Sequence, residues 1–120
     1  MSDKKKVLYV DDEWINLKVF SITFEEKYEI LVAESGREGL EIMSQHADIS
    51  IVFTDLRMPL MDGLGFIAEA KPLYPNVRYN LLTGFEKTQE IEDALHSGLL
   101  NKYFSKPFNK VEVLKELEKS

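Results

Sequence analysis

Five polar side chains that could act together on one substrate each stand at the end of an apolar run of the chain. They are Asp11, Asp12, Asp55, Thr83 and Lys106. Three carboxylates in one pocket would repel one another, and one of them would bind a proton unless a cation were present. Oxygen ligands without cysteine or a histidine pair favour Mg2+, which proteins bind through one or two carboxylates and retained water molecules.

Asp55 could act as a nucleophile, because a carboxylate can form an aspartyl phosphate. Phosphoryl transfer needs little from a protein beyond positioning and neutralisation of charge. Mg2+, the compact ammonium of Lys106 and the hydroxyl of Thr83 could together hold three phosphoryl oxygens. These residue types therefore indicate phosphoryl chemistry, provided that the fold brings them together.

The elements that would have to position these residues alternate regularly along the chain. Short β-rich runs are expected at residues 7–10, 28–33, 49–54, 77–82 and 103–104. Each is followed by apolar residues at helical spacing. Strict alternation predicts an α/β fold with a parallel sheet and helices on both faces, a (βα)5 three-layer sandwich. Ligands of such sheets bind beyond the carboxyl ends of the strands, where the winding direction reverses.

The flavodoxin-like strand order 2-1-3-4-5 would make the first and third strands neighbours at that point. Asp11, Asp12 and Asp55 would then converge. The order belongs to the fold class and is not written in the sequence itself.

Several local signals mark the ends of the helices. Ser35 and Glu38 match a capping box, which satisfies free N–H groups at a helix start. Gly98 is expected to end the fourth helix, and Pro72 and Pro75 are expected to close the third. The first helix carries two apolar series at helical spacing. The members of these series are Ile15, Val19 and Ile22, and Leu17, Phe20 and Phe24.

Length and composition predict one globular domain over residues 1–120 in the cytoplasm. The chain has 120 residues, no cysteine and a net charge of -6. That charge disfavours direct binding to nucleic acid, which needs clustered Lys and Arg. No apolar run approaches the roughly 20 residues that span a bilayer, and the basic start at Met1 is not followed by the long apolar stretch of a secretory signal.

Four motifs occur together, in order, at the expected strand ends. They are Asp11-Asp12, the run from Asp55 to Gly63 (DLRMPLMDG), Leu82-Thr83-Gly84, and Lys106-Pro107-Phe108. With this set the chain resembles the receiver domains of two-component response regulators, the CheY-like superfamily. The resemblance covers nearly the whole chain.

The resemblance implies a set of site residues. Asp55 would accept the phosphoryl group, and Mg2+ would be bound by Asp11, Asp12, Asp55 and the backbone carbonyl of Arg57. Of the first acidic pair, the second acid, Asp12, would be the direct ligand. The residues that sense the phosphoryl group would be Thr83 and Lys106, the switch aromatic would be Tyr103, and the bond before Pro107 would be cis.

The resemblance also implies the partners and the mode of action. A histidine kinase or phosphotransfer protein would donate the phosphoryl group to Asp55, Tyr103 would turn inward, and the face formed by helix 4, strand 5 and helix 5 would change. That face would control an unknown effector domain or protein and could form a homodimer. The domain would assist only its own phosphorylation and dephosphorylation and would not be a separate enzyme.

Three positions depart from expectation. Arg57 and Phe85, two residues after Asp55 and Thr83, are unusual together at the mouth of the family's site. We expect them to shield the acyl phosphate from water. Asn80 is a polar residue inside the apolar fourth strand and has no explanation in the sequence.

Alternative interpretations remain at this stage. The acids at 11–13 could simply favour the dipole at a helix start, and Tyr103 could be an ordinary strand aromatic. An aspartyl-phosphate phosphatase or phosphotransferase of the haloacid-dehalogenase type would also place an Asp after a strand. That class carries a second Asp two residues later, where this chain has Arg57. A degenerate receiver used only for interaction is a third interpretation, which the complete set of motifs argues against.

Overall fold

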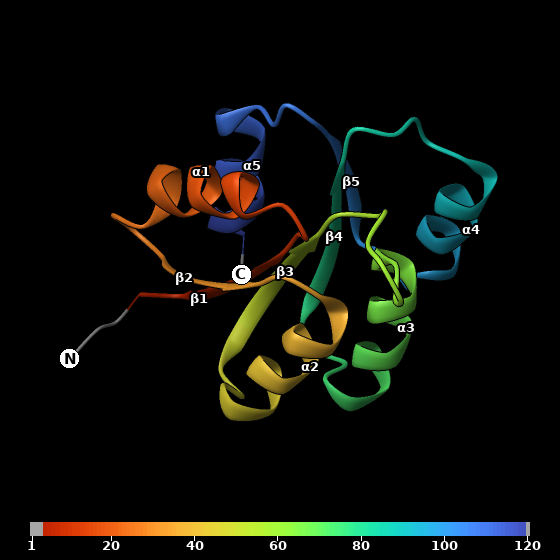
Figure 1. Ribbon diagram of the computed structural model, residues 1–120, viewed down its shortest axis with the longest axis horizontal. Helices are drawn as coiled ribbons and strands as arrows, with labels where there is room; N and C mark the ends of the chain where they lie inside the picture. The colour runs from red at the N-terminus through yellow and green to blue at the C-terminus, as the bar shows by residue number, and fades with distance from the viewer. Residues whose placement is uncertain (1–3, 120) are drawn as a thin grey trace.

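The β-rich runs form one parallel sheet of five strands in the order β2-β1-β3-β4-β5 (Figure 1). The computed structural model describes residues 4–119. The strands are β1 (Lys6–Val10), β2 (Glu29–Ala33), β3 (Ile49–Thr54), β4 (Arg78–Thr83) and β5 (Lys102–Ser105). The helices are α1 (Trp14–Phe24), α2 (Gly36–Gln45), α3 (Gly63–Leu73), α4 (Gln89–Ser97) and α5 (Lys110–Glu118). The predicted flavodoxin-like fold and its strand order are confirmed.

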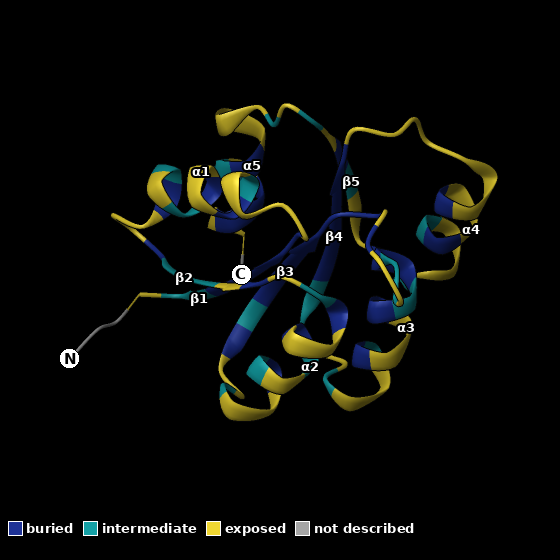
Figure 2. Cartoon of the chain, viewed as in Figure 1, coloured by how far each residue is buried: buried dark blue, intermediate teal, exposed yellow. Residues whose placement is uncertain are grey.

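Helices cover both faces of the sheet, with α1 and α5 on one side and α2, α3 and α4 on the other (Figure 1). Strands β1 and β3 are buried on both sides, which explains their nearly continuous apolar sequences (Figure 2). On the α1–α5 side, the ring of Phe20 lies 4.5 Å from that of Tyr9 and 5.5 Å from that of Phe53, measured between centroids. This aromatic contact seats α1 on the sheet and fixes the turn that carries Asp11 and Asp12.

The two apolar series of α1 differ in burial. Leu17, Phe20 and Phe24 are buried against the sheet. The other series is largely exposed, as is Trp14 at the start of the helix. Its members are Ile15, Val19 and Ile22, which we call the α1 stripe. The helix therefore has no fully polar face turned to solvent.

The predicted helix ends are confirmed except at Pro72. The hydroxyl oxygen of Ser35 accepts a hydrogen bond from the Glu38 N–H at 3.1 Å, and Gly98 ends α4 with a left-handed φ of 86°. Pro72, in contrast, lies inside the last turn of α3. A proline there removes one N–H, but the helix runs on to Leu73, and the N–H of the C-cap residue Tyr74 still reaches the Ala70 carbonyl at 2.8 Å.

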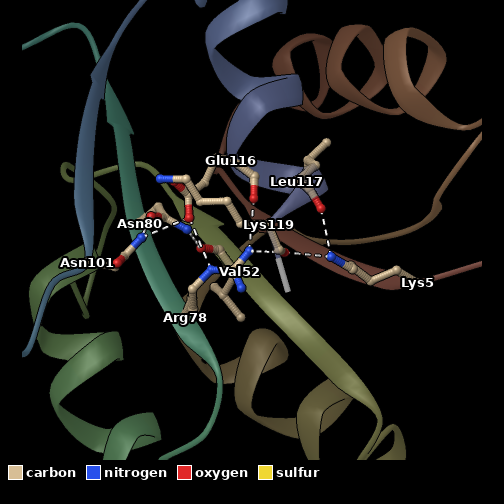
Figure 3. Close-up of polar contacts among 8 residues, drawn as sticks. All are labelled: Lys5, Val52, Arg78, Asn80, Asn101, Glu116, Leu117 and Lys119. Carbon is tan, nitrogen blue, oxygen red and sulfur yellow. Dashed lines mark hydrogen bonds and ion pairs between the residues drawn. The ribbon is translucent and has the colours of Figure 1, made fainter.

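A partly buried polar cluster lies at the amino-terminal ends of β4 and β5 and accounts for Asn80 (Figure 3). We call its four residues, Arg78, Asn80, Asn101 and Glu116, the base network. The Asn80 amide donates to the Val52 carbonyl at 3.2 Å and accepts from Asn101 at 2.8 Å. Asn101 and the Arg78 Nε each donate to Glu116 Oε2 at 3.0 Å. The network thus joins β3, β4 and the start of β5 to α5.

The carboxyl-terminal end of α5 is held by two cations (Figure 3). Lys5 Nζ donates to the carbonyls of Leu117 and Lys119 at 2.7 and 2.8 Å. Arg78 Nη2 donates to the carbonyls of Glu116 and Lys119, both at 2.8 Å. Carbonyls at a helix end lack partners within the helix and carry partial negative charge, so these contacts fix α5 against the sheet.

Within residues 4–119, no helix combines the length and the apolar character that crossing a membrane would require.

Candidate functional site

Three acidic side chains meet at the carboxyl ends of β1 and β3. Carboxylate oxygens of Asp11, Asp12 and Asp55 all lie within 4.8 Å of one another. The two strands are paired so that Val10 stands opposite Thr54, and the Asp55 N–H continues the ladder to the Val10 carbonyl at 2.9 Å. The convergence expected from the strand order is therefore present.

Asp11 is fully buried and is held by four donors. Its Oδ2 accepts from the Tyr9 hydroxyl at 2.6 Å, from Lys106 Nζ at 2.7 Å and from the Asn16 amide at 3.2 Å. Its Oδ1 accepts from the Glu13 N–H at 2.9 Å. Such a carboxylate is fixed in place and has little capacity left for further strong contacts.

Sequence reasoning missed the roles of Tyr9 and Asn16. Tyr9 stands two residues before Asp11, so the alternation of a strand puts both side chains on one side. Burial, followed by the charge of Asp11, raises the pKa of Tyr9, which therefore stays a donor at neutral pH. Asn16 is a polar residue in the first turn of a largely apolar helix, and that position was its only signal.

Asp12 differs from Asp11 because it is exposed. Among residues 4–119 its carboxylate has no hydrogen-bond or ion-pair partner. The second acid of the pair is therefore the one with free oxygens. This supports Asp12 rather than Asp11 as a direct metal ligand, which stays a prediction.

Asp55 is almost completely buried, with 6% of its surface exposed. Its Oδ1 accepts from the Leu56 N–H at 2.8 Å, and its Oδ2 lies 3.4 Å from Lys106 Nζ. Burial raises the pKa of Asp55, the charge of Lys106 opposes this, and the charge of Asp11 adds to it. A hydrogen bond from the Thr83 side chain also favours the ionised form. A further cation beside Asp55 would stabilise its ionised form.

The loop after Asp55 folds back on the acceptor and requires glycine at position 63. The Gly63 N–H donates to the Leu56 carbonyl at 2.8 Å. A Cβ atom at position 63 would collide with the Asp55 carbonyl oxygen, so only glycine permits this close approach. Asp62 caps α3 by accepting from the Gly65 N–H at 2.7 Å. The sequence run DLRMPLMDG therefore forms a closed loop that fixes Asp55 at its start.

Thr83 and Lys106 reach the site from the ends of β4 and β5. The Lys106 N–H donates to the Thr83 carbonyl at 2.9 Å, which extends the pairing of the two strands. The peptide bond between Lys106 and Pro107 is cis, as predicted. Both predicted phosphoryl-sensing residues thus border Asp55.

The other three predicted residues form the rim of the site. The guanidinium carbon of Arg57 lies 5.1 Å from the centre of the Phe85 ring. The Phe85 carbonyl accepts a hydrogen bond from the Tyr103 hydroxyl at 2.7 Å. The Phe85 N–H donates to Thr83 Oγ1 at 3.3 Å. Tyr103 is half-buried and packs against the core on the α2–α3–α4 side.

The site as a whole carries three acids and one ammonium in contact with them. A divalent cation held by oxygen ligands would balance the excess negative charge. The same cation, Lys106 and Thr83 could then bind an anionic group bonded to Asp55. The arrangement can therefore bind a metal ion and present one buried carboxylate as a nucleophile.

Comparison with known proteins identifies a family. The sequence model of the response regulator receiver domain matches residues 7–118. The chemotaxis protein CheY of Halobacterium salinarum is 30% identical over 111 residues, which cover 92% of this chain and 91% of that protein. The transcriptional regulatory protein YesN of Bacillus subtilis is 33% identical over 117 residues. Those residues are 94% of this chain and only 31% of that relative, so the chain corresponds to less than a third of YesN.

A similar solved structure is the CheX–CheY–BeF3–Mg complex from Borrelia burgdorferi. The match has a TM-score of 0.84 and 28% sequence identity, and it covers 94% of this chain and 86% of the other.

Proposed function

Because the chain belongs to the response regulator receiver domain family, we propose that it is a phosphorylation-dependent switch and that Asp55 is its phosphoacceptor. The observation that carries the proposal is the placement of Asp55. Its buried carboxylate shares the ammonium of Lys106 with Asp11 and lies beside a third acid, Asp12, so the three acids together carry more negative charge than Lys106 balances. Receiver domains are signalling modules. We infer that this one catalyses no separate turnover and works as a single domain in the cytoplasm.

The acids would serve to bind Mg2+. Asp12, Asp55 and the backbone carbonyl of Arg57 would be ligands, while Asp11, with its four donors, would act mainly by orienting the group. The ion would supply the positive charge that the site lacks. Lys106 and Thr83 would neutralise and hold the remaining phosphoryl oxygens.

The donor would be a phosphohistidine of a histidine kinase or phosphotransfer protein. In the transfer, one carboxylate oxygen of Asp55 forms a P–O bond while the P–N bond to the imidazole breaks, and the imidazole leaves with the bonding pair. Trp14 and Ile15 begin α1 just after the acids, the rest of the α1 stripe continues along the helix, and Trp14 and Ile22 are more than 60% exposed. A helical donor protein could pack its own apolar side chains there while its histidine reaches Asp55.

The response would pass through Thr83 and Tyr103 to the face formed by α4, β5 and α5. This face would control an effector domain or protein and could also form a homodimer. The change is a shift between two populated states of one fold.

Arg57 and Phe85 would shield the acyl phosphate from water. Their contact places a long cation and an aromatic ring together at the rim of the site. We expect Arg57→Ala and Phe85→Ala to shorten the lifetime of the phosphorylated form. Decay rates equal to those of the unchanged chain would contradict the shielding.

Labelling with acetyl phosphate tests the proposed function directly. With Mg2+, one phosphoryl group per chain should appear on Asp55 and should be stable to acid and labile to base. Asp55→Asn or removal of Mg2+ with EDTA should abolish the label. Rapid multiple turnover of unrelated phosphoesters would favour the phosphatase or phosphotransferase alternative instead.

A further inference from the structure

Lys106 has one ammonium for two carboxylates of the site. Its Nζ lies 2.7 Å from Asp11 Oδ2 and 3.4 Å from Asp55 Oδ2, so it is held more closely by Asp11. The proposed function requires the same ammonium to hold a phosphoryl oxygen on Asp55. Any movement of Lys106 toward that group takes a charged donor away from Asp11, which is fully buried. A buried carboxylate that loses its cation is destabilised unless other donors remain.

Tyr9 provides such a donor on the same oxygen. Its hydroxyl donates to Asp11 Oδ2 at 2.6 Å, and the Asn16 amide donates to that oxygen at 3.2 Å. Of these two neutral donors, the hydroxyl makes the shorter contact. It also belongs to a ring that is packed in place, because Tyr9 is 1% exposed and lies 4.5 Å from the ring of Phe20, measured between centroids. The hydroxyl is therefore fixed beside Asp11 independently of Lys106.

Packing of the core alone does not account for this hydroxyl. Tyr9 lies in an apolar layer with Phe20 and Phe53, where a phenylalanine ring would fill nearly the same space. A hydroxyl buried in such a layer lowers stability unless it is hydrogen-bonded. Asp11 accepts the bond that the hydroxyl needs, and the bond in turn stabilises the carboxylate. Tyr9 therefore contributes to the charge balance of the site as well as to the core.

We propose that Tyr9 is a positioning residue that stabilises Asp11 while Lys106 binds the phosphoryl group on Asp55. Before phosphorylation, Asp11 Oδ2 accepts from Lys106 and from two neutral donors. When the ammonium turns to the phosphoryl group, the Tyr9 hydroxyl becomes the strongest donor left on that oxygen. Without the hydroxyl, Asp11 would retain Lys106 more strongly, and the phosphoryl group would compete less well for it. This inference rests on the proposed function and explains how Lys106 becomes available.

Two binding measurements on Tyr9→Phe test the proposal. Beryllofluoride, which mimics a phosphoryl group on a carboxylate, is titrated at saturating Mg2+, and the bound fraction is read by fluorine NMR. We expect its Kd to rise about three- to tenfold, up to the size of one hydrogen bond to a charged group. Mg2+ alone is titrated with backbone amide NMR signals as the readout. Its Kd should not rise, because all three acids remain in place. A site that was merely loosened would bind both ligands more weakly.

Tyr28→Phe is the matched control. It removes the hydroxyl of another buried tyrosine in the same apolar layer, and Tyr28 stands just before β2, at the opposite edge of the sheet from the site. Both Kd values should be unchanged in this variant. Asn16→Ala is a second test on the same oxygen. It removes the longer neutral contact and should raise the beryllofluoride Kd by less than Tyr9→Phe does.

A double variant shows whether Tyr9 acts through Lys106. Lys106→Ala should weaken beryllofluoride binding strongly. In that chain Tyr9→Phe should have no further effect, because no ammonium then has to leave Asp11. The proposal would be overturned by an unchanged beryllofluoride Kd in Tyr9→Phe, by a Mg2+ Kd that rises in parallel, or by an equal effect in the Lys106→Ala chain. Failure of the unchanged chain to bind beryllofluoride would instead contradict the proposed function, and the role of Tyr9 with it.

Discussion

Two partly buried polar clusters lie at opposite ends of the same sheet and differ in their balance of charge. In the base network the single acid, Glu116, accepts from Arg78 and Asn101, and Lys119 lies 3.4 Å from its other oxygen. At the carboxyl ends of the strands, three acids lie together and one ammonium, that of Lys106, contacts two of them, Asp11 and Asp55. The charge of Glu116 is balanced by Arg78 and Lys119, although its Oε1 accepts no hydrogen bond, whereas the other cluster carries excess negative charge.

This difference separates a structural cluster from a functional one. An ion pair with additional hydrogen bonds needs no further cation, and here it joins α5 to the sheet. A pocket with excess acid is stable only if a proton or a cation joins it. Burial and polarity are similar in the two places. The need for a ligand is what distinguishes the site around Asp55.

The strongest test of the structural cluster is Arg78→Met. It leaves the Glu116 carboxylate, 1% exposed, with only the more distant and exposed Lys119 as an ion-pair partner, and it removes two donor contacts from the end of α5. We expect the free energy of unfolding to fall by about 3 kcal/mol, measured by urea denaturation. Replacing Glu116 by Met in the same chain should restore much of the loss, because no unpaired charge remains. Arg37→Met should cost less than about 0.5 kcal/mol, and a loss below about 1 kcal/mol for Arg78→Met would show that Glu116 does not depend on it.

The sequence was sufficient for the fold and for the placement of the main site residues. Alternating β-rich runs and helical spacing predicted five units, and Asp11, Asp55, Thr83 and Lys106 stand where those runs end. This worked because parallel strands bring their carboxyl ends to one edge, whatever their detailed packing. The cis bond before Pro107 was likewise anticipated from the family resemblance and is present.

Contacts between residues distant in sequence could not be predicted in the same way. Asn80 was unexplained because its partners, Asn101 and the Val52 carbonyl, are set by the register of three strands. The cation–π contact of Arg57 with Phe85 depends on how two loops approach each other. The pattern of α1 also did not say which apolar series faces the sheet. Helical spacing identifies the apolar faces of α1, but packing determines which of the two faces lies against the sheet.

Addition of Mg2+ should stabilise the site cluster and leave the base network unaffected. At a Mg2+ concentration ten times the Kd, we expect the free energy of unfolding to rise by about 1.4 kcal/mol, measured by thermal or urea unfolding. Asp12→Asn should lose most of this gain, since its free carboxylate is the predicted ligand. Glu116→Gln is the matched control, because it removes an acid from the other cluster and should keep the full response. A stability independent of Mg2+, or an undiminished response in Asp12→Asn, would contradict the metal site.

Asp55→Asn gives the smallest effect and the sharpest contrast in sign. Burial raises the pKa of Asp55 in the folded chain. Stability is then lost as the pH rises from the unfolded value of about 3.9 through the higher folded value, and the loss remains at neutral pH. Asparagine removes the charge, so in EDTA at pH 7 we expect a gain on the order of 1 kcal/mol, which shrinks in acid. Glu116→Gln should instead lower stability at pH 7, because Arg78 loses its charged partner. If Asp55→Asn were also destabilising without metal, the charges of the site would be balanced as in the base network. That result would contradict the inference that the site requires a cation.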